Sequence, residues 1–210
     1  MSVTAESYRR RMIAGLLPLA CPGCGRPADP VCPRCAATVR PAPSAPAPSG
    51  VDAWAAAFAY EGVARELVAR VKYRRAHAAT LWLADAMAPL LAPPLPAVVT
   101  WAPTSAERRR DRGFDHAEIL ARRVARQVRR PLRRLLVRLP GPAQTGRPAG
   151  ERRSGPRFSA RGKVGPSVLV VDDVATTGAT LAAAAAALRA AGATRVVALT
   201  AARTPPPQPW

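Results

Sequence analysis

Two adjacent carboxylates follow an apolar run in the segment VLVVDDVATTGATL, residues 168–181. Asp172 and Asp173 end the run, and a turn of small residues comes next, with Thr176, Thr177, Gly178 and Thr180. A Thr- and Gly-rich turn at the start of a helix offers hydroxyls and unpaired backbone N–H groups to a phosphate. The carboxylates repel a phosphate and need a donor or a cation, such as vicinal ribose hydroxyls or a magnesium ion. The segment therefore predicts a sugar-phosphate site, with the phosphate on the turn and the diol on the acids.

Two other interpretations of this segment stay open at the level of the residues. A plain strand-to-helix turn with an N-cap accounts for the threonines but leaves the paired acids unexplained. A magnesium-dependent receiver or phosphohydrolase site also places an Asp after a strand. Such a site needs further acids, and the chain has only 13 Asp and Glu residues.

The four cysteines of the chain lie together in CPGCGRPADPVCPRC, with the spacing C-x2-C-x7-C-x2-C. Each C-x-x-C turn aims two thiolates at one point, and two such turns complete a closed tetrahedral site of the structural zinc type. Two disulfides are disfavoured because the sequence predicts no secretion signal, and a redox C-x-x-C pair would not come doubled. We expect structural Zn²⁺ bound by Cys21, Cys24, Cys32 and Cys35.

The elements that position these residues alternate between strands and helices. Strands are expected at 51–60, 97–101, 167–171 and 195–203, and helices at 63–73, 77–91, 115–130 and 180–192. Asp115 and Glu118 resemble a capping box at the start of the helix over 115–130, and 138–163 is typical of a loop. This alternation predicts an α/β fold with a doubly wound, mostly parallel sheet, in which ligands bind beyond the carboxyl ends of the strands.

The chain divides by composition into four parts. We expect an N-terminal helix and the four-cysteine module over 1–40, a Pro-rich linker over 41–50, the α/β domain over 51–203, and a disordered tail over 204–210. Trp54, Trp82 and Trp101 are expected in the core, and His77 and His116 at the surface or in helix caps.

The positive charge of the chain is concentrated in one segment. The formal net charge is +19, and residues 107–163 hold 18 Lys or Arg and 5 Asp or Glu, a net of +13. A field of this size attracts polyanions such as pyrophosphate or nucleic acid, although a solvated arginine-rich surface has the same composition.

No run of residues approaches the ~20 apolar residues that a membrane span needs. The segment RRRMIAGLLPLAC, residues 9–21, resembles a short signal peptide, but Gly15 and Pro18 interrupt it and Cys21 belongs to the cysteine quartet. A cytoplasmic protein is therefore expected.

The segment VLVVDDVATTGATL resembles the phosphoribosyl-pyrophosphate (PRPP) motif of type I phosphoribosyltransferases. Nearly the whole chain resembles the ComF family of phosphoribosyltransferase-like proteins. The four-cysteine module, FAYEGVARELVARVKYRR, RRRDRGFDHAEILARRVA, and QTGRPAGERR followed by RF match in that order. One motif departs from the family, since RGF is followed here by Asp115 and His116 where Asn-Gln is common. The departure puts in doubt any acceptor role of that amide pair.

The resemblance implies a role for each matching position. Asp172 and Asp173 would hold the ribose hydroxyls in a catalytic site. The 5′-phosphate would bind the residues Ala175, Thr176, Thr177, Gly178, Ala179 and Thr180. The pyrophosphate would contact the APTS loop with Pro103 and Thr104, together with Lys72, Arg112, Arg152 and Arg153. PRPP binds as its Mg²⁺ complex in such proteins.

Two function classes follow from the resemblance and the charge. The first is an enzyme in which a nitrogen nucleophile displaces pyrophosphate from Mg-PRPP. The second is a non-catalytic accessory protein of DNA uptake and natural competence, which binds single-stranded DNA and competence proteins and keeps a regulatory or relic PRPP site. The acceptor and the oligomeric state are not readable from the residues.

Overall fold

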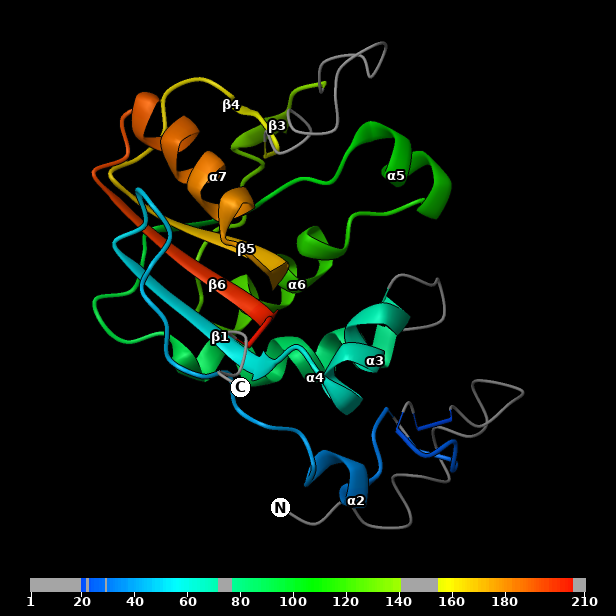
Figure 1. Cartoon of the computed structure of the whole chain (residues 1–210). Coiled ribbons are helices and arrows are strands. Elements are labelled where there is room, and N and C mark those ends of the chain that lie inside the picture. Colours follow the sequence, from blue (N-terminus) through cyan, green and yellow to red (C-terminus); the bar gives the residue numbers. More distant parts are fainter. Residues whose placement is uncertain (1–19, 22, 29, 72–76, 141–154, 206–210) are drawn as a thin grey trace, which may run out of the picture.

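The predicted alternation of strands and helices forms a layered α/β domain (Figure 1). The computed structural model of the chain describes residues 20–205 apart from 22, 29, 72–76 and 141–154. Four parallel strands make the central sheet in the order β1-β6-β5-β2. They are β1 (Ala53–Ala59), β6 (Arg195–Arg203), β5 (Ser167–Ala175) and β2 (Val98–Trp101). The prediction of a parallel sheet is therefore confirmed.

Helices cover both faces of the sheet, as the near-continuous apolar runs of its two central strands require. One face of the sheet packs against α7 (Ala179–Ala190). The other face packs against three helices, α3 (Gly62–Val71), α4 (His77–Met87) and α6 (His116–Gln127). A short 3₁₀ helix, η1 (Ala88–Leu90), follows α4.

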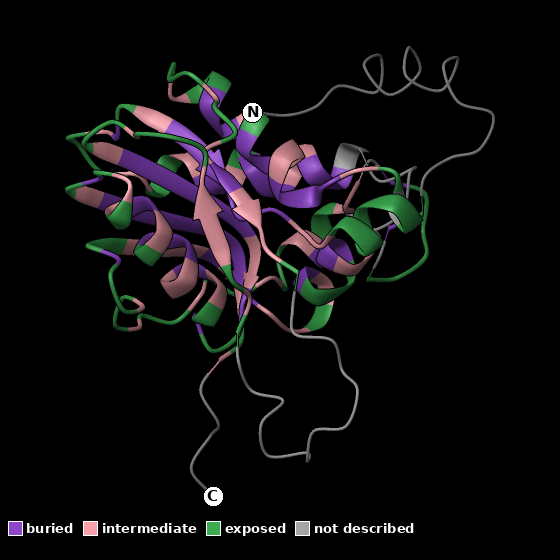
Figure 2. Cartoon of the chain, turned by 90° about the horizontal axis from the view of Figure 1, so that it is seen from above, coloured by how far each residue is buried: buried purple, intermediate pink, exposed green. Residues whose placement is uncertain are grey.

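Alternate residues of β5 enter the two cores, because successive strand side chains point to opposite faces. Val168 and Val170 pack with Leu181 and Leu188 under α7. Leu169 and Val171 belong to the second core, with large side chains that include Leu67, Leu83 and Leu120. Figure 2 shows much of the central sheet in purple, with pink toward the strand ends and edges.

Three elements lie where no helix or strand was predicted. The helix α5 (Ala106–Arg112) is short and polar and has no apolar stripe, so its periodicity gives no signal. Ser105 caps it by accepting the Arg108 N–H at 3.3 Å, and Gly113 ends it at a φ of 79°. The strands β3 (Leu136–Arg138) and β4 (Phe158–Ala160) form an antiparallel pair. They have three residues each and depend on a pairing distant in sequence.

The Pro-rich residues 41–48, here called the strap, lie against the domain. The Arg40 carbonyl, just before the strap, accepts the Ala59 N–H at 3.0 Å. The Ala42 N–H, at the start of the strap, donates to the Ala57 carbonyl at 3.1 Å. These two hydrogen bonds cover part of the β1 edge. Further along, Pro48 lies so close to Gly178 that a Cβ on Gly178 would be 2.8 Å from Pro48 Cγ. The strap thus runs from the sheet edge to the start of α7.

The cysteine module includes α2 (Pro33–Ala36) and contacts the sheet domain through α3. Val63 packs against the cluster of Cys21, Ala28 and Cys35. A Cβ on Gly23 would be 2.6 Å from Val63 Cγ2, so this glycine allows the close approach. Across the described ranges, no helix has the length and apolar character to cross a membrane.

Candidate functional site

The sequence predicted that the paired acids follow a strand ending at residue 171. In the structure they lie inside β5, among its last residues. The strand continues to Ala175 because β6 is equally long and pairs with it throughout, with Asp172 opposite Thr200 and Ala175 opposite Arg203. Asp172 is buried, with 9% of its surface exposed, and Asp173 is partly exposed. The acids therefore form the carboxyl end of a central parallel strand, where α/β proteins bind ligands.

Burial controls the ionisation of the first acid. Desolvation raises the pKa of Asp172 well above its ordinary value, and the neighbouring charge of Asp173 adds to the effect. The Asp173 N–H donates to Asp172 Oδ1 at 2.9 Å, and the Val174 N–H donates to Asp173 Oδ1 at 2.7 Å. A cation or a pair of hydroxyl donors at this point would stabilise the charged form of both carboxylates.

The Thr- and Gly-rich turn joins β5 to the N-terminus of α7. Gly178 is the N-cap residue and has a φ of 76°, a left-handed conformation that favours glycine. Thr176 and Thr177 are exposed, and the Ala179 N–H donates to Thr177 Oγ1 at 3.4 Å. The first turn of α7 contains no acidic residue, so its N–H groups and dipole favour an anion.

The loop after β2 lies beside the acids. The Ala102 N–H donates to the Val171 carbonyl at 3.0 Å, which brings Pro103 and Thr104 to the same end of the sheet. The Thr104 N–H donates to Asp115 Oδ2 at 2.9 Å. Asp115 therefore occupies one of the backbone donors that the resemblance implies for pyrophosphate.

Asp115 and His116 are both buried, with 5% and 4% of their surfaces exposed. Asp115 is the N-cap residue of α6, and its carboxylate accepts the Thr104 N–H instead of completing the predicted capping box. Desolvation raises the pKa of Asp115, and the hydrogen bond from Thr104 opposes the rise. His116 was expected at the surface. Its ring instead packs edge-on against Phe114, with the ring centroids 4.9 Å apart.

Arg138 is a cation of this site that sequence reasoning missed. It ends β3, and its guanidinium lies 5.9 Å from the centroid of the Phe158 ring. Burial and the charge of Arg108 lower its pKa, while Asp172 and Asp115 act in the opposite direction. Nothing in the spacing of the basic segment distinguished Arg138 from its neighbours, because its proximity to the acids depends on the β3–β4 pairing.

Several predicted pyrophosphate contacts are not placed. Lys72, Arg152 and Arg153 lie outside the described residues. Arg112 is the last residue of α5, and its side chain is likewise outside the description. These assignments stay predictions.

The four cysteines meet at one point as free thiols, with their sulfur atoms all within 4.8 Å of one another. The Sγ atoms of Cys24 and Cys32 are 3.6 Å apart. Two thiolates on one tetrahedral Zn²⁺ are about 3.8 Å apart, given a Zn–S distance of about 2.3 Å, so the cluster fits the ion. The predicted metal-binding arrangement is confirmed for these four residues.

One thiol of the cluster ionises more readily than an ordinary cysteine. Burial of Cys21 opposes ionisation, but backbone N–H groups, led by that of Cys32 at 3.5 Å, outweigh it and lower the pKa of Cys21 to about 6. Thiolates are the form that binds a metal. Burial and the neighbouring cysteines raise the pKa of Cys35 to about 12, so the four thiols do not all ionise without a metal.

Comparisons with known proteins assign the chain to no family. It matches no protein-family profile and no curated protein. Among solved structures it is similar to a purine phosphoribosyltransferase from Pyrococcus horikoshii Ot3, with 21% identity and a TM-score of 0.41 over 60% of this chain and 74% of that chain. At this identity and TM-score the likeness has no bearing on function.

Proposed function

We propose that the chain is a phosphoribosyltransferase-like protein that binds Mg-PRPP. The observation that supports this most directly is the position of the segment DDVATTG. Its acids end the central strand β5 and its Thr/Gly turn starts α7. One continuous stretch thus offers acceptors for a diol and donors for a phosphate at adjacent points, as a ribose 5-phosphate requires.

In this proposal Asp172 and Asp173 accept hydrogen bonds from the ribose hydroxyls, and residues 175–180 hold the 5′-phosphate. Pro103 and Thr104 line the pyrophosphate position. Magnesium would arrive with PRPP and neutralise charge on the departing pyrophosphate. Arg138 compensates part of the negative charge that Asp172 and Asp115 place at this end of the sheet.

The enzymatic form of the proposal is pentosyl transfer. A nitrogen nucleophile of the acceptor attacks the anomeric carbon of the ribose as the bond to pyrophosphate breaks, through an oxocarbenium-like transition state. The protein contributes orientation and charge stabilisation, which suffice for large rate effects in such reactions. We place this reaction in the cytoplasm.

Titration calorimetry of Mg-PRPP into the wild type and the Asp172→Asn/Asp173→Asn variant tests the proposal. We expect saturable binding to the wild type and at least about tenfold weaker binding to the variant, because the Asn oxygens accept the diol hydrogen bonds without the negative charge that strengthens them. An Asp111→Asn variant, altered at an exposed acid of α5, serves as the control. Equal binding to all three proteins, or binding to none, would contradict the sugar-phosphate site.

We propose a structural role for the cysteine module, with Zn²⁺ as its ion. All four sulfur atoms converge, so a tetrahedral ion would have no open position for a substrate. The ion would contribute folding energy to the module and take no part in the transfer reaction.

A second candidate function is supported by the exposed arginines beside the β2 edge. Arg129, Arg130, Arg133 and Arg134 are all exposed, and among the described residues none of them forms an ion pair. A row of unpaired guanidinium groups suits single-stranded DNA, through phosphate contacts and stacking on bases. This is the accessory role in DNA uptake and natural competence, with competence proteins as partners.

Binding of a fluorescent single-stranded oligonucleotide at several salt concentrations tests this candidate. The affinity should fall steeply with salt, and the Arg133→Gln/Arg134→Gln variant should show a slope smaller by about 1.4, since each phosphate contact contributes about 0.7. Absence of binding, or an affinity that does not change with salt, would exclude it.

A further inference from the structure

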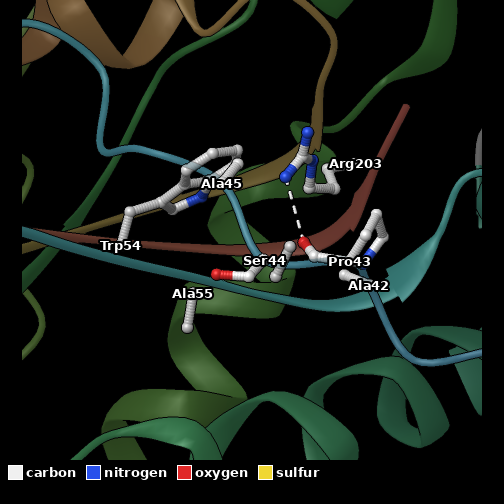
Figure 3. Close-up of a pocket in the computed structure, with 8 residues that line it drawn as sticks. Ala42, Pro43, Ser44, Ala45, Trp54, Ala55 and Arg203 are labelled. Atoms are coloured by element: carbon white, nitrogen blue, oxygen red, sulfur yellow. Dashed lines mark hydrogen bonds between the residues drawn. The ribbon is translucent and has the colours of Figure 1, made fainter. Parts of the chain in front are cut away.

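A cavity of about 150 Å³ lies between the strap and the sheet, apart from the paired acids. Strap residues 42–45 form one wall, and residues 54–56 of β1 with Arg203 of β6 form the other. In Figure 3 the side chains of Trp54 and Arg203 rise from the same side of the sheet, with the strap beside them. Most of the remaining lining is alanine, so the polar character of the cavity depends on few groups.

The two large side chains of the cavity present hydrogen-bond donors. Arg203 lies over the Trp54 ring, 5.4 Å from its centroid, and one guanidinium nitrogen donates to the Pro43 carbonyl at 3.0 Å. A guanidinium has five N–H donors, and within the described ranges no carboxylate pairs with this one. No acidic side chain lines the cavity.

Trp54 adds a donor that the fold leaves unused. Its Nε1 is shielded from solvent and has no hydrogen-bond partner in the described structure. A buried donor without an acceptor is costly and uncommon in native proteins. An acceptor that entered beside the strap would satisfy this N–H and the open guanidinium donors together.

We propose that this cavity binds a small carboxylate. A planar two-oxygen anion matches the fork of a guanidinium and can extend one oxygen toward an adjacent N–H. The volume corresponds to about five water molecules, which limits the bound part to a group of a few heavy atoms. The carboxylate accepts from the open guanidinium donors of Arg203 and from Trp54 Nε1, while the alanines contact its carbon end.

The cavity and the paired acids lie on opposite sides of strand β6 in the sheet. The cavity's lining residue Ala56 shares a row of the sheet with Thr200 and Asp172, so the β6 strand separates the two sites. The strap continues from the cavity to Pro48 on Gly178. The two sites share no residue, so carboxylate binding can be measured without PRPP.

The indole N–H signals of ¹⁵N-labelled full-length protein report the binding directly. The chain has four tryptophans, and a Trp54→Phe variant identifies the signal of Trp54. We expect acetate and pyruvate to shift the Trp54 indole proton downfield in a saturable way, with the Trp82 and Trp101 signals unchanged. Sodium chloride at equal ionic strength should give no saturable shift.

Two variants separate the role of Arg203 from a general effect of charge. Arg203→Gln should weaken acetate binding about tenfold or more, because charge-assisted hydrogen bonds are lost. Arg203→Lys keeps the charge but not the fork, and should also weaken it. The matched control Arg161→Gln removes an exposed arginine elsewhere and should leave acetate binding unchanged.

Three results would overturn the proposal. The first is a Trp54 signal that does not saturate with either carboxylate. The second is equal acetate affinity in the wild type and both Arg203 variants, with native Trp82 and Trp101 signals showing that the variants fold. The third is inorganic phosphate binding as tightly as acetate, which would make the cavity a general anion site.

Discussion

At the scale of single residues, three aspartates show that position determines the ionisation of a carboxyl group. The Val196 N–H donates to Asp52 at 2.7 Å, and this bond and the Arg189 guanidinium lower the pKa of Asp52. Asp115 and Asp172 are buried, and desolvation raises the pKa of both. All three are the same residue type in the sequence. Their surroundings make the charged form of Asp52 favourable and the charged forms of Asp115 and Asp172 unfavourable.

Asp172→Asn should stabilise the folded protein at neutral pH and lose this advantage in acid. The folded pKa of Asp172 is raised, so the folded state keeps a proton that the unfolded state releases. The contribution of Asp172 to stability therefore declines as the pH rises above the unfolded value of about 3.9. Asn keeps an acceptor for the Asp173 N–H but carries no charge to bury. We expect a gain of about 1 kcal/mol or more at about pH 7.5.

Urea unfolding across the pH range measures this effect. The gain should shrink toward zero near pH 4, where the wild-type carboxyl is also neutral, and Asp111→Asn at an exposed position should change stability by less than about 0.5 kcal/mol at any pH. If Asp172→Asn is less stable than the wild type at neutral pH, or more stable by the same amount at all pH values, Asp172 is not desolvated in the folded protein.

At the scale of elements, tertiary contacts replaced some of the local signals of the sequence. The spacing of Asp115 and Glu118 predicts a capping box, yet Asp115 binds the Thr104 N–H of a different loop. The start of α7 follows its local signal, because Gly178 takes a left-handed conformation that few other residues adopt. The strap adds a second constraint at that same glycine.

Gly178→Ala should destabilise the protein more than a strained backbone alone explains. The left-handed conformation costs an alanine about 1–2 kcal/mol, and the new Cβ would be 2.8 Å from Pro48 Cγ. Gly162 is a matched control, since its φ is 74° and nothing lies within 4 Å of a Cβ there. Chemical unfolding gives the loss in the free energy of unfolding for each variant. The loss for Gly178→Ala minus that for Gly162→Ala is the cost of the Pro48 contact, which we expect to be on the order of 1 kcal/mol.

The combination Gly178→Ala/Pro48→Ala should recover most of that difference. If Gly178→Ala costs no more than Gly162→Ala, the strap does not pack against the start of α7 in solution.

At the scale of the whole molecule, the described residues of the cysteine module meet the sheet domain at a few points. Val31 and Val63 each pack against both the cysteine cluster and the domain core under α3, α4 and α6. Arg40 pairs with Glu61, and Arg40 and Ala42 bond to the β1 edge. The two large cores of the sheet domain include no cysteine. Loss of the metal should therefore affect the module more than the domain.

Chelation should make the module sensitive to trypsin while the sheet domain stays resistant. A structural Zn²⁺ contributes about 10–16 kcal/mol to folding of a small module, so its removal should raise cleavage after the exposed Arg34 at least about tenfold. Mass spectrometry of timed digests identifies the sites, and chelator pre-saturated with zinc is the control. Metal analysis should find about one zinc per chain. Cleavage unaffected by chelation would contradict a metal-dependent module.

The sequence by itself determined the features that depend on neighbouring residues. The cysteine spacing predicted a four-sulfur cluster, apolar runs predicted the parallel strands, and the DDVATTG segment predicted acids before a helix start. Each of these depends on short-range geometry, which residue types and spacing encode directly. The element boundaries were less exact, since β5 extends through both acids only because β6 pairs with it.

Only the tertiary structure decided which distant residues meet. It buries Asp172 and His116, pairs Asp115 with the loop after β2, and brings Arg138 near both acids. It also places Arg203 over the Trp54 ring, although the two residues are far apart in the sequence. The N–H of Trp54 is left without an acceptor there. These arrangements depend on how the sheet orders its strands and on where the strap lies against it. No local pattern in the chain encodes them.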